Sequence, residues 1–356
     1  MSSIPAAAPG IAWAEPHREQ AFQRWFEPAA TRHGLLATSL RPASSDASFR
    51  RYFRVDAGGG AAYIVMDAPP PQEDVRPFVD IAARLARAGL NAPRIVEQDA
   101  ASGFLLLSDL GTRLYLNELL AAQAAGDSAI ITTLMHDATQ ALVRWQLYGS
   151  VDGLPPYDDS LLRRELELFA QWCVQREFAV TWREAQQRTW RSTCDLLVAS
   201  ALAQPQVAVH RDYMPRNLMV CTPNPGILDF QDAVCGPASY DPACLLRDAF
   251  ISWDEALELD WAVRYWQAAR KVGLPLADDF GEFWRQLEWM GLQRHLKVLG
   301  IFARIRHRDG KPGYVEDTPR FLAYVRPVAE RYRELAPLAR LLDRIAQRTP
   351  AIGHTF

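Results

Sequence analysis

Between residues 207 and 232 the chain reads VAVHRDYMPRNLMVCTPNPGILDFQD. Two short apolar runs flank a polar loop that carries Asp212 and Asn217, and a proline-rich turn leads into a third apolar run that ends at Asp229. Short apolar runs bounded by turn residues predict buried strands. The pattern therefore predicts a small two-strand platform on which one amide and two carboxylates converge.

These side chains are of the types that phosphoryl transfer requires. A carboxylate must accept the proton of the attacking hydroxyl, and hard oxygen ligands must hold the magnesium ion that bridges the phosphates. The spacing HxDxxxxN followed by DFxD resembles the catalytic loop and metal-binding segment of protein kinases. It is closer still to the aminoglycoside phosphotransferase and choline kinase-like small-molecule kinases. A simpler alternative, that Asp212 and Asn217 only cap a turn, leaves Asp229 unexplained.

The resemblance implies a protein kinase-like bilobal fold of class α+β. A small antiparallel sheet with a helix would bind the nucleotide in residues 1–108. A larger, mainly α-helical part, residues 109–356, would hold the catalytic loop and the substrate. The resemblance also implies ATP and Mg2+ as cofactors, with Asp212 as the catalytic base and Asn217 and Asp229 as magnesium ligands.

Neighbouring residues receive supporting roles from the same resemblance. His210 would orient the loop, and Asp241 would brace it through backbone hydrogen bonds. Asp232 is either a further metal ligand or a carboxylate beside the ligands. Protein kinases carry a lysine two residues after the base, where this chain has Met214. Arg216 either supplies the positive charge of that lysine or is a solvated loop residue, and we count it among the catalytic residues.

The residues that precede the loop show the expected mixture of helix and strand. Apolar residues recur at helical spacing over 15–33 and 74–88. Apolar and aromatic runs predict strands over 49–55, 62–66 and 104–107, with a small polar loop over 42–48 before them. From about 112 to 350 the pattern is mainly helical, apart from the island at 207–230.

Two segments are expected to contact the nucleotide. The small polar loop stands in the place of a glycine-rich phosphate loop, because small residues let backbone N–H groups approach a phosphate. The segment after the strand at 104–107 would be the hinge that binds adenine. The residues concerned are Ser44, Ser45, Asp46, Ala47 and Ser48 in the loop, and Ser108, Asp109 and Leu110 in the hinge.

The lysine that this fold normally places on its third strand is missing. The aligned strand ends at Met66, and residues 1–270 contain no lysine. The following helix also lacks the glutamate that pairs with such a lysine, and the joint loss is coherent because an orphan buried charge is costly. Either the chain is a pseudokinase, or Arg50, Arg51 or Arg54 reaches the phosphates. We favour the arginines and count Arg51 among the nucleotide-binding residues.

Composition excludes several classes of protein. The 356 residues carry 39 basic and 42 acidic side chains, a net charge of -3, so no strong field attracts nucleic acid. No apolar run approaches the roughly 20 residues of a membrane span. Five cysteines without CxxC spacing and a start unlike a secretory signal favour reduced thiols and the cytoplasm. No obligate protein partner is evident.

A basic stretch lies near the C-terminal end. It could meet an anionic group of a substrate, but a solvated helix face is the favoured interpretation. The residues are Arg294, His295, Lys297, Arg304, Arg306, His307, Arg308 and Lys311.

A narrower resemblance covers nearly the whole chain. The stretches SSDASFRRYFR, VMDAPP, LLLSDLG, VHRDYMPRNLMV and GILDFQDAVCGPASYDPACLLRD are similar to those of the bacterial anomeric sugar kinases. This resemblance implies phosphorylation of the C1 hydroxyl of N-acetylmuramate and N-acetylglucosamine by ATP, in cell-wall recycling towards UDP-MurNAc. Aminoglycoside, choline and homoserine kinases share the same core and remain alternatives, as does a non-catalytic nucleotide-binding module.

Overall fold

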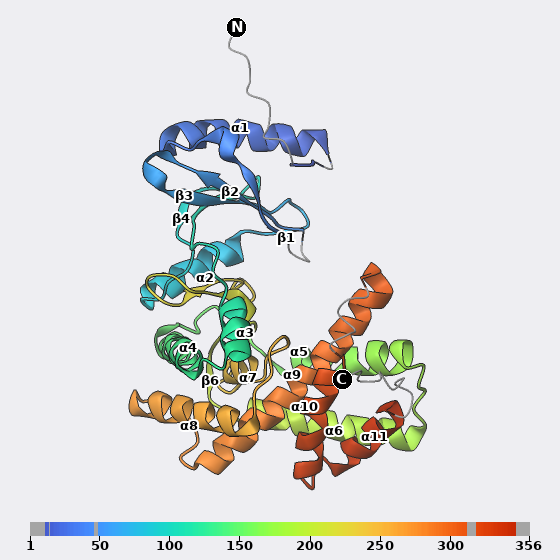
Figure 1. Cartoon of the computed structure of the whole chain (residues 1–356). Coiled ribbons are helices and arrows are strands. Elements are labelled where there is room, and N and C mark those ends of the chain that lie inside the picture. Colours follow the sequence, from blue (N-terminus) through green and yellow to red (C-terminus); the bar gives the residue numbers. More distant parts are fainter. Residues whose placement is uncertain (1–10, 14, 46–48, 312–317, 347–356) are drawn as a thin grey trace. The chain divides into compact units, whose positions relative to one another are not determined.

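The computed structural model describes residues 11–13, 15–45, 49–311 and 318–346 (Figure 1). The chain divides into two compact units. The first comprises Met1–Tyr115 and Asn217–Asp232, and the second comprises Leu116–Arg216 and Ala233–Phe356. The short segment 217–232 thus belongs with the N-terminal part of the chain.

An antiparallel five-stranded sheet forms the centre of the first unit, as the resemblance to kinases predicts. Its strand order is β1-β2-β3-β5-β4. Phe53 pairs with Val65 and Val65 pairs with Leu106, so apolar side chains of three neighbouring strands share one face. The strands are β1 (Arg41–Ser45), β2 (Arg51–Asp56), β3 (Ala62–Asp67), β4 (Ile95–Asp99) and β5 (Phe104–Ser108).

Helix α1 (Pro16–His33) packs on this face of the sheet, and helix α2 (Arg76–Arg87) lies later in the unit (Figure 1). Phe22, Phe26 and Ala30 recur every four residues along α1, which places them on one stripe in the core cluster. Both helices and the strands predicted over 49–55, 62–66 and 104–107 are confirmed within a few residues.

The predicted loop over 42–48 is wrong in its first half. Residues up to Ser45 form strand β1, in which Ser44 pairs with Tyr52. Local composition favoured a loop because small polar residues have low strand propensity, but an edge strand needs only one paired neighbour. Asp46, Ala47 and Ser48 lie outside the described residues.

The segment 217–232 adds the short strands β7 (Leu218–Met219) and β8 (Gly226–Ile227) to the first unit. The backbone N–H of Val220 donates to the carbonyl oxygen of Arg113 at 2.8 Å, and that of Ile227 donates to Asn91 at 2.8 Å. These bonds tie the predicted metal segment to the N-terminal part of the chain.

The second unit is mainly helical, as predicted, with one small sheet in which β6 pairs with β9. None of the described helices is long and apolar enough to cross a membrane. The elements are α3 (Tyr115–Ala125), whose first residue falls in the first unit, α4 (Ser128–Tyr148), α5 (Asp159–Leu168), a π-helix (Phe169–Glu177), α6 (Glu184–Leu202), β6 (Gln206–Val209), β9 (Val234–Pro237), α7 (Tyr240–Leu246), α8 (Glu255–Lys271), α9 (Phe280–Asp309), α10 (Thr318–Arg331) and α11 (Ala336–Ala346).

Helix α9 is the longest element of this unit and packs closely on the end of α5. A Cβ atom on Gly300 would lie 2.3 Å from the backbone carbonyl carbon of Leu168, so only glycine allows the two backbones to approach this closely. The close approach positions the middle of α9, which carries the first half of the basic stretch.

Candidate active site

A buried carboxylate holds the start of the predicted catalytic loop. The Oδ2 atom of Asp241 accepts the backbone N–H of His210 at 2.7 Å, and its Oδ1 atom accepts that of Arg211 at 2.9 Å. Arg211 has a φ of +75°, a left-handed conformation that a non-glycine residue adopts only when its surroundings enforce it. The predicted brace is confirmed.

The loop itself is folded around Asp212. The backbone N–H of Asp212 donates to Nδ1 of His210 at 3.3 Å, and the backbone N–H of Met214 donates to the carbonyl oxygen of Asp212 at 3.0 Å. His210 is 1% exposed. Its ring contacts the loop backbone from the buried side, in accord with an orienting role.

A buried charge cluster lies beside this loop. The carboxylate of Glu165, on α5, pairs with Nη2 of Arg211 at 2.7 Å and with Nζ of Lys297, on α9, at 2.9 Å. Tyr157 donates its hydroxyl to the same carboxylate. Burial by itself would raise the pKa of Glu165, but Lys297 and Arg211 outweigh it and lower that pKa to about 2. Glu165 therefore stays ionised and neutralises part of the cluster.

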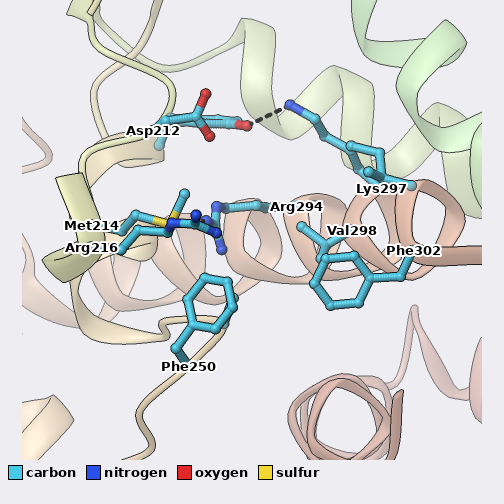
Figure 2. Close-up of a pocket in the computed structure, with 11 residues that line it drawn as sticks. Asp212, Met214, Arg216, Phe250, Arg294, Lys297, Val298 and Phe302 are labelled. Atoms are coloured by element: carbon cyan, nitrogen blue, oxygen red, sulfur yellow. Dashed lines mark hydrogen bonds between the residues drawn. The ribbon is translucent and has the colours of Figure 1, made fainter. Parts of the chain in front are cut away.

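A pocket of about 150 Å³ opens beside Asp212 in the second unit (Figure 2). One wall is a single face of α9, because its residues follow the three-and-four spacing of a helix. The other walls come from the catalytic loop, α7 and the segment after it. The lining residues are Asp212, Met214, Arg216, Tyr240, Ala249, Phe250, Arg294, Lys297, Val298, Ile301 and Phe302.

The interpretation of the basic stretch as a solvated helix face is wrong for its first half. Arg294 is 3% and His295 1% exposed, and Lys297 is largely buried. Arg306 and His307 are exposed and both pair with Glu177, so the second half fits the interpretation. In the sequence, apolar side chains recur at three- and four-residue spacing on the same helical face as Arg294 and Lys297. This pattern indicated a buried face.

Arg216 lies at the edge of the same pocket. Its side chain is exposed, and its guanidinium carbon sits 4.8 Å from the centre of the Phe250 ring. This stacking holds a positive charge on the pocket that Asp212 also lines.

The predicted metal ligands come together within the first unit. The Nδ2 atom of Asn217 donates to Oδ2 of Asp229 at 3.3 Å, and Gln231 donates to Oδ1 of the same carboxylate at 3.0 Å. Asp229 has a φ of +60°. Phe230 is buried, with its ring 4.6 Å from that of Phe78 on α2, and fixes the segment.

One carboxylate and one amide oxygen suit Mg2+, which usually takes one or two protein carboxylates and completes its coordination with water and phosphate oxygens. No group of three or more His, Cys, Asp or Glu side chains in the part of the chain that the structure describes could hold a metal. A site with one carboxylate and one amide contains fewer than three such side chains, so the absence of a larger group is compatible with it. Asp232 is exposed and its carboxylate accepts a 3.4 Å hydrogen bond from Gln231.

Each of the three candidate arginines in the first unit has a carboxylate partner. The Nε atom of Arg50 lies 3.5 Å from Glu73, that of Arg51 lies 2.9 Å from the buried Asp67, and that of Arg54 lies 2.6 Å from Asp109. The Arg50–Glu73 pair joins a cation just before β2 to a carboxylate just before α2. Glu73 was not predicted as a partner from the sequence, because it precedes the helix on which the glutamate of such a pair is expected.

The residues of the predicted hinge make several contacts within the first unit. The backbone N–H of Arg94 donates to Oγ of Ser108 at 2.8 Å, and Asp109 accepts the N–H of Gly111 at 2.9 Å. The side chain of Leu110 packs against Gly226, since a Cβ added there would lie 2.8 Å from its Cδ1 atom.

Solved kinases of small molecules share this fold. The structure aligns with the GDP complex of aminoglycoside 2'-phosphotransferase-IIIa with a TM-score of 0.59 at 13% identity, over 90% of this chain and all of the other. Choline kinase from Cryptosporidium parvum aligns with a TM-score of 0.58 at 10% identity, over 90% of this chain and 99% of the other. These likenesses establish the kinase-like α+β fold.

The sequence comparisons are more specific. The phosphotransferase enzyme family (APH) matches residues 39–280. The N-acetylmuramate/N-acetylglucosamine kinase of Pseudomonas putida is 55% identical over 306 residues, 86% of this chain and 88% of its own. The kinase of the same name from Neisseria meningitidis is 44% identical over 315 residues, 88% of this chain and 93% of its own. The chain belongs to the phosphotransferase enzyme family.

Proposed function

We propose that the protein transfers the γ-phosphoryl group of ATP to the C1 hydroxyl of N-acetylmuramate and of N-acetylglucosamine. The observation that carries the proposal is the 55% identity, over most of both chains, to a kinase named for these two sugars. The braced loop with Asp212 and the Asn217–Asp229 pair supports it. We propose further that it acts in cell-wall recycling towards UDP-MurNAc, in the cytoplasm.

Asp212 is the proposed catalytic base. The C1 oxygen attacks the γ-phosphorus, the bond from that phosphorus to the oxygen of the β-phosphate breaks, and ADP leaves. The proton of the C1 hydroxyl passes to the carboxylate of Asp212. The anomeric hydroxyl is a fair nucleophile because the ring oxygen withdraws charge and makes its proton more acidic.

Asn217 and Asp229 are the proposed ligands of Mg2+, which when bound neutralises charge on the phosphates. The Gln231 amide and the buried Phe230 hold the carboxylate of Asp229 in place. Arg216 places a positive charge beside Asp212 for the transferred group.

The nucleotide is proposed to lie against residues 1–108. Its phosphates would meet the segment Ser44–Ser48 and an arginine, and its adenine would meet the hinge Ser108–Leu110. Arg51 remains our proposal for the arginine, although Asp67 and the carbonyl oxygen of Ala12 at 3.0 Å now occupy its guanidinium. Arg50, which lies beside Glu73, and Arg54 remain the alternatives.

Phosphorus NMR of the purified protein with Mg-ATP and each sugar tests the proposal. The expected result is a new phosphomonoester signal, split by the anomeric proton, with each sugar and not in a sugar-free control. A signal without that splitting would contradict phosphorylation at C1. Absence of any sugar phosphate with either sugar would overturn the proposed function, and nucleotide binding without turnover would then favour a pseudokinase.

A further inference from the structure

Arg294 differs from two other arginines of the second unit, the buried Arg247 and the half-buried Arg211. Arg247 is 4% exposed and pairs with Glu258 at 3.0 Å and Glu288 at 3.1 Å. Arg211 pairs with Glu165 at 2.7 Å. Arg294 is 3% exposed, and among the described residues it makes no ion pair within 4.0 Å.

The hydrogen bonds of Arg294 are also incomplete. Its Nη2 atom lies 3.6 Å from the thioether sulfur of Met214, a weak acceptor, and its Nη1 atom has no partner among the residues that the structure describes. Burying a donor without a partner destabilises the folded chain, and more so when the donor is charged. A residue that carries this cost is a candidate for binding a ligand.

The guanidinium of Arg294 lines the pocket beside Asp212. It reaches from α9 towards Met214 and Arg216 (Figure 2). Arg294 is therefore placed to contact a molecule whose hydroxyl reaches Asp212.

The charges of the pocket favour an anion. Glu165 pairs with both Lys297 and Arg211, and Nζ of Lys297 also donates to the hydroxyl of Tyr240 at 3.1 Å (Figure 2). Asp212 contributes one negative charge to the pocket lining, and Arg216 and Arg294 contribute two positive charges. Asp248 also acts electrostatically on Arg294. However, the Oδ1 atom of Asp248 accepts the backbone N–H groups of residues 250 and 251, and Asp248 forms no ion pair with Arg294.

The two proposed substrates differ in one charged group. N-acetylmuramate carries a lactyl ether with a carboxylate where N-acetylglucosamine has a hydroxyl. A guanidinium binds a carboxylate through two parallel hydrogen bonds, which is the contact that Arg294 lacks. We propose that Arg294 binds the lactyl carboxylate of N-acetylmuramate and sets the preference for that sugar; this inference rests on the proposed function.

The transferred phosphoryl group is the other anion that reaches Asp212, and the test separates the two. The Arg294→Gln variant is compared with the unmodified protein by kcat/KM for each sugar at saturating ATP. The ratio of kcat/KM for N-acetylmuramate to that for N-acetylglucosamine is expected to fall about 10- to 100-fold, as for a lost charged hydrogen bond. Arg294→Lys, which keeps the charge but not the fork, is expected to give an intermediate ratio.

The matched control is Arg285→Gln. Arg285 lies on the same helix, is exposed and pairs with Glu334 at 2.9 Å, so its loss is expected to leave the ratio unchanged. An equal loss for both sugars in Arg294→Gln would assign Arg294 to phosphoryl transfer or to structure and would overturn the inference. An unchanged ratio would overturn it as well.

A second measurement does not depend on the folding of a variant. The methyl ester of N-acetylmuramate removes the charge from the substrate, and the unmodified protein is expected to use the ester about 10-fold less efficiently than the acid or worse. Equal efficiency would overturn the inference. If the unmodified protein phosphorylates neither sugar, the proposed function fails and the inference fails with it. If it phosphorylates both sugars, but uses the ester as well as the acid and has the same kcat/KM ratio as Arg294→Gln, only the inference fails.

Discussion

The Oδ2 atom of Asp241 accepts a 2.7 Å hydrogen bond from the backbone N–H of His210, across 31 positions of the chain. Asp241 is fully buried in the first turn of α7, and the bond joins that helix to the start of the catalytic loop. Burial raises the pKa of Asp241 to about 7, against the effect of the two backbone N–H donors. The conformation of the loop thus depends on one carboxylate with two acceptor oxygens.

Asp241→Asn tests this dependence. The asparagine side chain has one oxygen in place of two, so it can accept only one of the two backbone N–H groups. The other N–H group, of His210 or Arg211, would face the amide nitrogen and lose its acceptor. We expect a loss of about 1–3 kcal/mol in the free energy of unfolding, together with lower kcat. Urea unfolding and a sugar-kinase assay measure the two effects, with the exposed Asp232→Asn as control for stability. Unchanged stability and kcat would contradict the bracing role.

Asp212→Asn is expected to lower kcat by about 10²- to 10⁴-fold, because the amide cannot accept the proton of the C1 hydroxyl. Asp241 and His210 hold the loop through its backbone N–H groups, which the variant keeps, so the thermal unfolding transition should stay nearly unchanged. ADP release and circular dichroism check the two statements. Full turnover by the variant would remove Asp212 from the mechanism.

Single Arg→Gln changes at Arg50, Arg51 and Arg54 test the replacement of the missing lysine. We expect Arg51→Gln to raise KM for ATP and to lower stability, since the buried Asp67 would keep Arg18 as its cationic partner and lose Arg51. Initial rates at varied ATP and thermal melts give the two readouts. If all three variants leave KM for ATP and kcat untouched, none of these arginines replaces the lysine.

Glu165→Gln tests the charge cluster through the pH dependence of stability. An unfolded chain protonates this carboxyl near pH 4.5, whereas Lys297 and Arg211 hold the folded pKa at about 2. Its stabilising contribution is therefore complete above pH 4.5 and is lost as the pH falls towards 2, by about 1.4 kcal/mol per pH unit.

We expect the difference in free energy of unfolding between the unmodified protein and Glu165→Gln to shrink between pH 6 and pH 3.5 in urea titrations. The exposed Glu184→Gln is the control, since its pair with Arg188 lies in solvent and should give a smaller change. A difference that does not vary with pH would show that Glu165 is not held ionised by the cluster.

Gly300→Ala tests the contact between α9 and α5. The added methyl group would lie 2.3 Å from the backbone carbon of Leu168, so one helix must move, at a cost of about 1–3 kcal/mol. Gly291→Ala on the same helix is the matched control. Its methyl group would meet atoms no nearer than 3.7 Å, and alanine is the better helix former by up to about 1 kcal/mol. Equal melting temperatures for the two variants would contradict the close approach.

Much of the fold could be predicted because its signals are local. The apolar stripe of α1 and the apolar and aromatic runs of β2 and β3 show in the sequence, and their predicted ranges hold within a few residues. The edge strand β1 was missed because pairing with β2, not composition, makes it a strand. The partner Glu73 of Arg50 was missed because ion pairs do not follow helix boundaries.

The sequence by itself determined the kinase-like fold and the candidate base and metal ligands. Asp212 and Asn217 stand five residues apart and Asp229 twelve further on, so spacing along one short segment was enough to select them as candidates. Only the tertiary structure decided that Arg294 lines the pocket of Asp212, because its contact with Met214 joins positions 80 apart. Such contacts depend on how whole helices pack, and the charge pattern of one helix does not contain that information.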